Sequence, residues 1–276
     1  MDVLYLAAGS QKWGMGHLRR SLELIDELRL RKNKVFSAAV IPDDRDSRLS
    51  GTVKGYDRYV AGLDELGDIP AEGIVVDVHT DFQPGVLRWL KKRHCPAAAL
   101  DWYFRKDQAV ASTINLRGGV APLKYALIRK EFYALRRISQ NQKEYDAVVV
   151  FGGKDARGYL DKLLEIFSGG AFYQNKKIVM IAGPMAEGKI LQWIGRKKGP
   201  VRVMKNPGNL AAFMARAKVG ITNGGTTLME FTMLGVPTIV FPQSRQETNF
   251  IPAFLRQGGS LRGDLRLESL KRQLYS

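Results

Sequence analysis

The chain has 276 residues, of which 45% are hydrophobic and 25% charged, as in an ordinary globular protein of one large domain or two smaller ones. One cysteine excludes an internal disulfide and a multi-cysteine zinc site, and without a run of roughly 20 apolar residues or a signal-peptide layout we expect a cytoplasmic protein. The formal net charge of +16 is spread along the chain, which leaves open a solvated basic surface or a peripheral membrane contact, and no motif supports a nucleic-acid partner.

The N-terminal segment predicts a strand, a glycine turn and a helix that together suit an anion. The apolar run Val3–Ala8 predicts the strand, and apolar residues three or four apart over Leu18–Leu28 predict one face of the helix. Between them, Gly14 and Gly16 let the backbone approach a ligand, and the helix N-terminus offers N–H groups and positive potential. His17 follows directly. Because an imidazole titrates near neutrality, this turn predicts an enzyme with a general acid or base beside a phosphorylated substrate.

Predicted strands alternate with helical patterns along the whole chain, in two series separated by a polar joint at Ser139–Glu144. Such alternation is typical of parallel sheets with helices on both faces. We therefore predict an α/β fold of two Rossmann-like, doubly wound domains, residues 1–143 and 144–276, with a ligand cleft between them. The strands after the first are expected at Val35–Ile41, Ile74–Val78, Ala97–Leu100, Ala147–Phe151, Lys177–Ala182, Val201–Met204, Val219–Thr222 and Thr238–Phe241.

Two glycine-rich loops have the outline of nucleotide sites but lack a required residue. The turn Gly14–Arg19 begins like the dinucleotide fingerprint, yet Arg19 stands where a small residue must let helix and strand pack, so a dehydrogenase is not expected. The segment Gly183–Ile190 has the spacing of a phosphate loop, but Ile190 cannot hold magnesium and Pro184 removes one backbone N–H. We interpret this second loop as an ordinary strand-to-helix turn rather than an ATP or GTP site.

A third loop, between the predicted strand Val219–Thr222 and a predicted helix Thr227–Leu234, has the features of a diphosphate site. Its glycines give access, its threonines supply hydroxyls, and the helix N-terminus supplies N–H groups. Glu230, one turn into the helix, is placed to accept hydrogen bonds from a ribose diol. The alternative is that a threonine only caps the helix and Glu230 is a surface acid. The loop residues are Asn223, Gly224, Gly225, Thr226 and Thr227.

This loop belongs to a longer stretch that resembles a known enzyme group. The segments Asn223–Glu230, Leu234–Val240 and Gln246–Asn249 resemble the nucleotide-sugar half of GT-B-fold enzymes, which include the bacterial transferase that adds N-acetylglucosamine to the lipid-linked cell-wall precursor. A closer likeness is to the UDP-sugar hydrolases of pseudaminic acid biosynthesis and related spore-coat polysaccharide proteins. That likeness covers most of the chain and rests on Gly14–Arg20, Val75–Asp77, Tyr125–Phe132 and Phe151–Asp155, in the family's order.

The resemblance implies a metal-independent hydrolase without a cofactor. Such an enzyme releases UDP and a free amino or deoxy sugar for surface polysaccharide or nonulosonic acid biosynthesis. His17 would be the catalytic group beside the anomeric carbon, and Glu230 would bind the ribose. The remaining contacts would come from Gly225, Thr226 and Thr227 on the diphosphate and from Asn249 on the sugar or a phosphate.

The chain departs from these hydrolases at one place. Where they tend to carry Asp-His-Tyr, this chain has Asp77-Val78-His79, so an imidazole replaces an aromatic hydroxyl that is expected to contact substrate. Either His79 serves as a similar donor or the sugar pocket differs. Asp77 either orients a base or caps a loop.

The nature of the acceptor also stays open. A glycosyltransferase that moves the sugar to a lipid or glycan acceptor is the alternative function. The aromatic and basic segment Leu123–Arg137 would then lie on the acceptor side, or else it forms an interdomain helix. A non-catalytic nucleotide-sugar binding protein is a third reading, which the presence of His17 disfavours.

Overall fold

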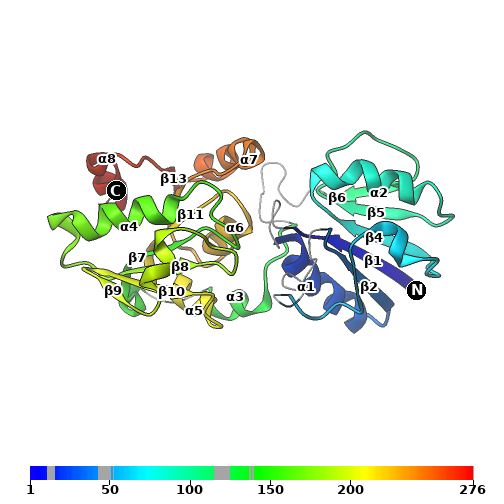
Figure 1. The fold of residues 1–276 in the computed structure, drawn as a ribbon, viewed down its shortest axis with the longest axis horizontal. Helices are drawn as coiled ribbons and strands as arrows, with labels where there is room; N and C mark the ends of the chain where they lie inside the picture. The colour runs from blue at the N-terminus through cyan, green and yellow to red at the C-terminus, as the bar shows by residue number, and fades with distance from the viewer. Residues whose placement is uncertain are drawn as a thin grey trace. The chain divides into compact units, whose positions relative to one another are not determined.

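The structure, a computed structural model, describes residues 1–10, 16–42, 51, 53–114, 125–136, 138 and 140–275. The chain divides into two compact units, Met1–Gly118 with Lys124–Leu127 and Gly119–Leu123 with Ile128–Ser276 (Figure 1). Helix α3 (Lys130–Leu135) precedes the predicted domain boundary at residue 144, and it packs against α5 (Leu210–Ala215) and α6 (Thr226–Met233) of the second unit.

The first unit is built on a parallel sheet with the strand order β3-β2-β1-β4-β5-β6 among its described residues. Central strand β1 is an unbroken apolar run after its first residue, as a strand covered on both faces requires. Leu4 and Leu6 share a buried cluster with Val86 and Leu87 of α2, and Tyr5 points to the opposite face. The elements are β1 (Asp2–Ala8), α1 (Gly16–Leu30), β2 (Lys34–Val40), β3 (Arg58–Val60), η2 (Leu63–Leu66), β4 (Gly73–Asp77), η3 (Thr80–Phe82), α2 (Gln83–Leu90), β5 (Ala97–Leu100) and β6 (Ser112–Ile114), where η marks a short 3-10 helix.

The strand order of this sheet reverses between β1 and β4. From β1 the chain moves outward through β2 to β3, and it then returns to the other side of β1 as β4. In open α/β sheets, ligands bind outside the carboxyl ends of the strands at such a switch point. His17 follows β1, and Asp77 ends β4.

The second unit has the strand order β13-β12-β11-β7-β8-β10-β9, and its paired strands are parallel except at the edge strand β9. The order reverses between β7 and β11, so the loops Phe151–Asp155 and Asn223–Gly225 flank its switch point. A buried cluster joins Phe151 to Phe167 of α4 and Leu270 of α8. The remaining elements are η4 (Gln140–Gln142), β7 (Tyr145–Val150), α4 (Tyr159–Gly169), η5 (Ala171–Tyr173), β8 (Ile178–Ala182), η6 (Lys189–Trp193), β9 (Lys197–Lys198), β10 (Val201–Lys205), β11 (Ala217–Thr222), β12 (Thr238–Val240), α7 (Arg245–Arg256), β13 (Ser260–Arg262) and α8 (Leu267–Tyr275).

The prediction of an α/β fold with two doubly wound parallel sheets is confirmed. Each predicted strand corresponds to an observed one. The sequence did not predict the edge strands β3, β6, β9 and β13, because each has only two or three residues and lacks an apolar run. Within the described part of the chain, no helix has both the length and the apolar character needed to cross a bilayer.

Candidate active site

His17 and Asp77 form a close pair at the switch point of the first sheet. His17 is the second residue of α1, and Asp77 is the last residue of β4. The imidazole Nδ1 lies 2.7 Å from Oδ1 of Asp77. Asp77 is completely buried, whereas the side chain of His17 is partly exposed. A carboxylate thus holds a solvent-accessible imidazole, which is the arrangement of a base with its orienting group.

A buried arginine fixes the carboxylate. One turn after His17 on α1, Arg20 donates from Nε to Oδ2 of Asp77 (2.8 Å) and from Nη2 to Oδ1 (2.5 Å). Its Nη1 donates to Asp101, which follows β5 (3.0 Å), and Ser21 donates from Oγ to Oδ2 of Asp77 (2.9 Å). Arg20 is 2% exposed, so these charge-assisted bonds act in a low-dielectric interior. The cluster ties α1 to the carboxyl ends of β4 and β5.

The protonation state of the pair follows from these contacts. Burial alone would raise the pKa of Asp77, but the charges and hydrogen bonds of Arg20 and His17 outweigh it and hold that pKa well below its usual range. Asp77 is therefore a carboxylate at neutral pH, and it can only accept. Nδ1 of His17 then carries the proton and donates to Asp77. Nη2 of Arg20 also lies 3.1 Å from Nδ1, but a guanidinium cannot accept, so Asp77 sets the tautomer and the basic lone pair of neutral His17 is on Nε2.

His79 lies beside His17 and caps a short helix. The two rings are edge to face, with their centroids 6.3 Å apart. Nδ1 of His79 accepts from the backbone N–H of Asp81 (3.2 Å) at the start of η3. Neutral His79 therefore carries its proton on Nε2, where it is able to donate. Its contact with substrate remains a prediction.

The loop after β5 presents two aromatic side chains next to this cluster. Gln83 is completely buried, and its Oε1 accepts from the backbone N–H groups of Tyr103 and Phe104 (3.0 Å each) while its Nε2 donates to the carbonyl of Asp101 (2.9 Å). Asp101 has a φ of 49°, which is uncommon for a residue with a side chain. Tyr103 is 56% exposed and Phe104 is 38% exposed. A fixed backbone thus holds two aromatic rings at the surface.

In the second unit, Glu247 of α7 organises the predicted diphosphate loop. Its Oε1 accepts from Nδ2 of Asn223 (2.7 Å), and its Oε2 accepts from the backbone N–H groups of Gly224 (3.2 Å) and Gln243 (2.7 Å). A Cβ at Gly224 would lie 2.9 Å from Cβ of Glu247 and 2.9 Å from Cγ1 of Ile251, so the loop requires glycine there. The amides of Asn223 and Gly224 are thus used to shape the loop.

The helix after this loop starts without a side-chain cap. The N-cap of α6 is Gly225, and Thr226 is the first helical residue, so neither threonine is the cap that the alternative interpretation required. Gly152, in the loop after β7, has a φ of 69°, and a Cβ there would lie 3.8 Å from Oγ1 of Thr227. The two loops at the switch point of the second sheet therefore meet at the start of α6.

The other predicted site residues lie in different environments, from buried to exposed. Glu230 is 4% exposed, and its Oε1 accepts from Nε of Arg129 (3.0 Å), so it is not a surface acid. Asn249 is exposed in the second turn of α7. Gly16 begins α1, and a Cβ there would meet no described atom within 4 Å, so packing does not require a glycine. Gly14 lies outside the described residues.

The segment Gly183–Ile190 binds an internal carboxylate. Asp161 of α4 accepts from the backbone N–H groups of Lys189 (2.9 Å) and Ile190 (2.6 Å), which are amides that a phosphate loop would offer to phosphate. Ile190 is completely buried, and the helix that follows is only the short η6. This contact gives a physical reason to interpret the segment as an ordinary turn.

Most of the second unit is similar to a known glycosyltransferase domain. Residues 147–250 match the model of the glycosyltransferase family 28 C-terminal domain. The chain is 22% identical to an uncharacterised protein of Methanocaldococcus jannaschii, over 93% of this chain and 59% of that protein. It is 25% identical to the spore coat polysaccharide biosynthesis protein SpsG of Bacillus subtilis, over 53% of this chain and 43% of SpsG. The chain therefore spans less than two thirds of the length of either relative.

Solved structures with the same architecture cover the whole chain. The TM-score is 0.64 with a glycotransferase of kitacinnamycin, at 13% identity over 99% of this chain and 89% of that one. The TM-score with MurG of Acinetobacter baumannii is 0.61, at 14% identity over 99% of this chain and 90% of MurG. The chain has the GT-B fold. The chain also matches the structure of the UDP-GlcNAc 2-epimerase of Methanocaldococcus jannaschii with a TM-score of 0.59. The identity is 13%, over 100% of this chain and 92% of the epimerase.

In this GT-B chain the matched family model includes the predicted diphosphate loop and Glu230, whereas His17 and Asp77 lie before the matched residues. The groups that hold these residues in place were not predicted from the sequence. One signal was available, because Arg20 is one turn from His17 on the predicted helix and so shares its face. The missed residues are Arg20, Ser21, Gln83, Asp101, Arg129 and Glu247.

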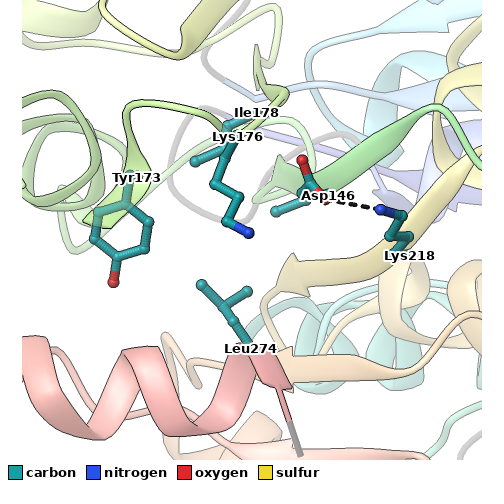
Figure 2. A pocket seen from close by; sticks show the side chains of 7 residues that line it. Asp146, Tyr173, Lys176, Ile178, Lys218 and Leu274 are labelled. Atoms are coloured by element: carbon teal, nitrogen blue, oxygen red, sulfur yellow. Dashed lines mark hydrogen bonds and ion pairs between the residues drawn. The ribbon is translucent and has the colours of Figure 1, made fainter. Parts of the chain in front are cut away.

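The pocket in Figure 2 is lined by none of the residues of the loops Phe151–Asp155 and Asn223–Gly225. It is lined by Asp146, Lys218 and Ile178, at the amino ends of β7, β11 and β8, and by Tyr173, Lys176, Ala147 and Leu274. Ligands of open α/β sheets bind at the carboxyl ends, so this pocket is not the expected nucleotide site. Among the residues that the structure describes, no group of three or more His, Cys, Asp or Glu side chains is arranged to hold a metal ion.

Replacing Glu247 should loosen the predicted diphosphate loop. Glu247→Ala removes the acceptor for three N–H groups, and we expect the free energy of unfolding to fall by about 1–3 kcal/mol in urea denaturation. Glu268→Ala is the matched control, because Glu268 is an exposed helical acid paired with Lys271 and should change stability by less than about 0.5 kcal/mol. Equal effects of the two substitutions would contradict this role of Glu247.

Proposed function

We propose that this chain is an enzyme that acts on a nucleotide-linked sugar and hydrolyses a UDP-linked amino or deoxy sugar at the anomeric C–O bond. The observation that carries the proposal is the pair of His17 and Asp77 at the switch point of the first sheet, with the lone pair of neutral His17 on Nε2. The likeness to a spore coat polysaccharide biosynthesis protein supports a product used in surface polysaccharide or nonulosonic acid synthesis.

In the proposed reaction, His17 is the general base. Nε2 takes a proton from water as the water oxygen forms a bond to the anomeric carbon. The bond from that carbon to the diphosphate oxygen breaks, and UDP leaves with the electron pair. Asp77 accepts a hydrogen bond from Nδ1 and stabilises the imidazolium that forms. Because diphosphate is already a good leaving group, the protein mainly has to stabilise its developing charge.

The second unit would bind the nucleotide. The uncapped start of α6 offers N–H groups and positive potential to the diphosphate at Gly225, Thr226 and Thr227. Glu230 would accept from the ribose hydroxyls, and Asn249 would contact the sugar or a phosphate. The match of this region to a glycosyltransferase C-terminal domain supports these roles.

A glycosyltransferase is the second candidate, and one feature of the first unit favours it. Tyr103 and Phe104 are exposed on a backbone that Gln83 fixes next to Asp101. Exposed aromatic rings on a fixed backbone can receive the apolar or sugar face of an acceptor without a cost for ordering that backbone. In that reaction His17 would deprotonate an acceptor hydroxyl instead of water.

Release of UDP in the absence of an acceptor separates the two functions. With a panel of UDP-linked amino and deoxy sugars, we expect rapid formation of UDP and a free reducing sugar, measured by anion-exchange chromatography. UDP that appears only after a lipid or glycan acceptor is added would favour the transferase. If calorimetry detects no binding of UDP or of any of these sugars, the nucleotide-sugar proposal is wrong.

A further inference from the structure

Glu230 is a buried carboxylate with a cationic partner from another helix. It lies on α6 and is 4% exposed, so an unpaired charge there would be costly. Nε and Nη2 of Arg129 both approach its Oε1 at 3.0 Å. Arg129 is the N-cap residue of α3, more than a hundred positions earlier in the chain. The pair therefore connects α3 to the helix that follows the diphosphate loop.

The guanidinium of Arg129 is itself held in place. Its Nη1 lies 2.7 Å from Oε1 of Glu131, and its Cζ lies 4.7 Å from the ring centre of Phe132. Phe132 is completely buried, so this ring is a fixed surface. A charged group with contacts on three sides has lost most of its rotamer freedom, and it can impose one orientation on its partner.

We propose that Arg129 is a positioning residue that holds Glu230 in the orientation that accepts the ribose diol, and that it thereby sets the preference for ribonucleotides. The inference rests on the proposed nucleotide role of the second unit. A carboxylate offers about four lone-pair sites, two on each oxygen, and both nitrogens of Arg129 approach the same oxygen, Oε1. A positive charge at this distance favours the ionised form of a carboxylate in general, and an ionised carboxylate is the stronger acceptor for a hydroxyl.

Loss of Arg129 would affect the ribose contact and spare the diphosphate contact. Without the guanidinium, Glu230 would be a buried charge with reduced compensation, which favours its protonation or its rotation toward water. Both changes weaken acceptance from a hydroxyl. The N–H groups at the start of α6 belong to the backbone and would keep their places. The loss of nucleotide affinity on substitution of Arg129 should therefore depend on the presence of the ribose 2′-hydroxyl.

Calorimetry with UDP and 2′-deoxy-UDP tests this dependence. We expect the unaltered protein to prefer UDP by about tenfold, and Arg129→Met to prefer it by less than about threefold, with little change in the affinity for 2′-deoxy-UDP. Arg136→Met is the matched control, because Arg136 is an exposed residue at the other end of α3 and its substitution should keep the preference. In a Glu230→Gln background, Arg129→Met should have no further effect on the preference, since the two residues act together.

The outcomes separate this inference from the function on which it rests. If the unaltered protein binds neither nucleotide, the proposed function is wrong and the role of Arg129 falls with it. If it prefers UDP and Arg129→Met keeps that preference, or weakens both ligands equally, only the role of Arg129 is wrong. Should circular dichroism show Arg129→Met to be unfolded, Arg129→Lys replaces it, because lysine keeps the charge but has one donor nitrogen where the guanidinium presents two in a fixed plane. Full retention of the preference in Arg129→Lys would then overturn the inference.

Discussion

His17→Ala should reduce turnover by about 10²–10⁴-fold and change UDP affinity by less than about threefold. The large effect on rate follows from the loss of the Nε2 lone pair, which Asp77 exposes for proton transfer by holding the proton on Nδ1. The small effect on affinity follows from the assignment of the nucleotide contacts to the second unit. Steady-state kinetics on the best UDP-sugar, together with calorimetry on UDP, measures both quantities.

The chain contains its own control for this substitution. His94 is exposed and follows α2, so His94→Ala should leave both turnover and affinity unchanged. If His17→Ala weakens UDP binding as much as it slows turnover, His17 is a phosphate ligand and not the base. The same reading would apply if the rate of His17→Ala recovered fully at a saturating substrate concentration.

Much of the fold was predictable because the central strands are fully buried. Val3–Ala8 and Ala147–Phe151 are continuous apolar runs, and each lies at the centre of its sheet. Edge strands carry no such signal. All of β6, for example, is exposed, and its backbone pairs in parallel with β5. Its identity as a strand depends on that neighbour rather than on its own three residues.

The candidate site was predictable only for residues that stand in local motifs. His17 follows a glycine turn and Glu230 follows the predicted diphosphate loop, so the position of each residue in its motif was enough to predict a functional role. Asp77 allowed two interpretations, because nothing local shows that a residue sixty positions away will contact it. Arg20 looked like one basic residue among many in a chain with 43 lysines and arginines. Its position one turn after His17 is the local signal, and its burial, which depends on the whole sheet, sets it apart from the other basic residues.

For Glu247, the sequence motif was recognised but the residue in it that contacts the loop was not. The segment Gln246–Asn249 was singled out for its resemblance to the nucleotide-sugar enzymes, with Asn249 as the expected contact. The structure leaves Asn249 exposed and uses Glu247 to hold Asn223 and Gly224. In a helix, residues two positions apart face different directions, so the motif alone could not show which one would meet the loop.

Asp77→Asn should lower the free energy of unfolding at pH 7 by about 3–5 kcal/mol, because it leaves the buried Arg20 with only part of its compensating charge. The pH dependence should change as well. Since Arg20 and His17 hold the pKa of Asp77 below its unfolded value of about 3.9, the ionised carboxylate stabilises the fold above that pH. This stabilisation is lost as the pH falls below about 4 toward the folded pKa.

Urea unfolding at a series of pH values between 7 and 3 measures both effects. The unaltered protein should lose stability steeply below about pH 4, and Asp77→Asn should lose less over the same range because it has no carboxylate to protonate there. Asp68→Asn is the control, since Asp68 is fully exposed and its contact with Arg93 is 3.5 Å long, so its stability curve should follow that of the unaltered protein. A curve for Asp77→Asn that is parallel to the unaltered protein's at every pH would mean that Asp77 is not ionised in the fold. The tautomer of His17, and with it the assignment of Nε2 as the base, would then be wrong.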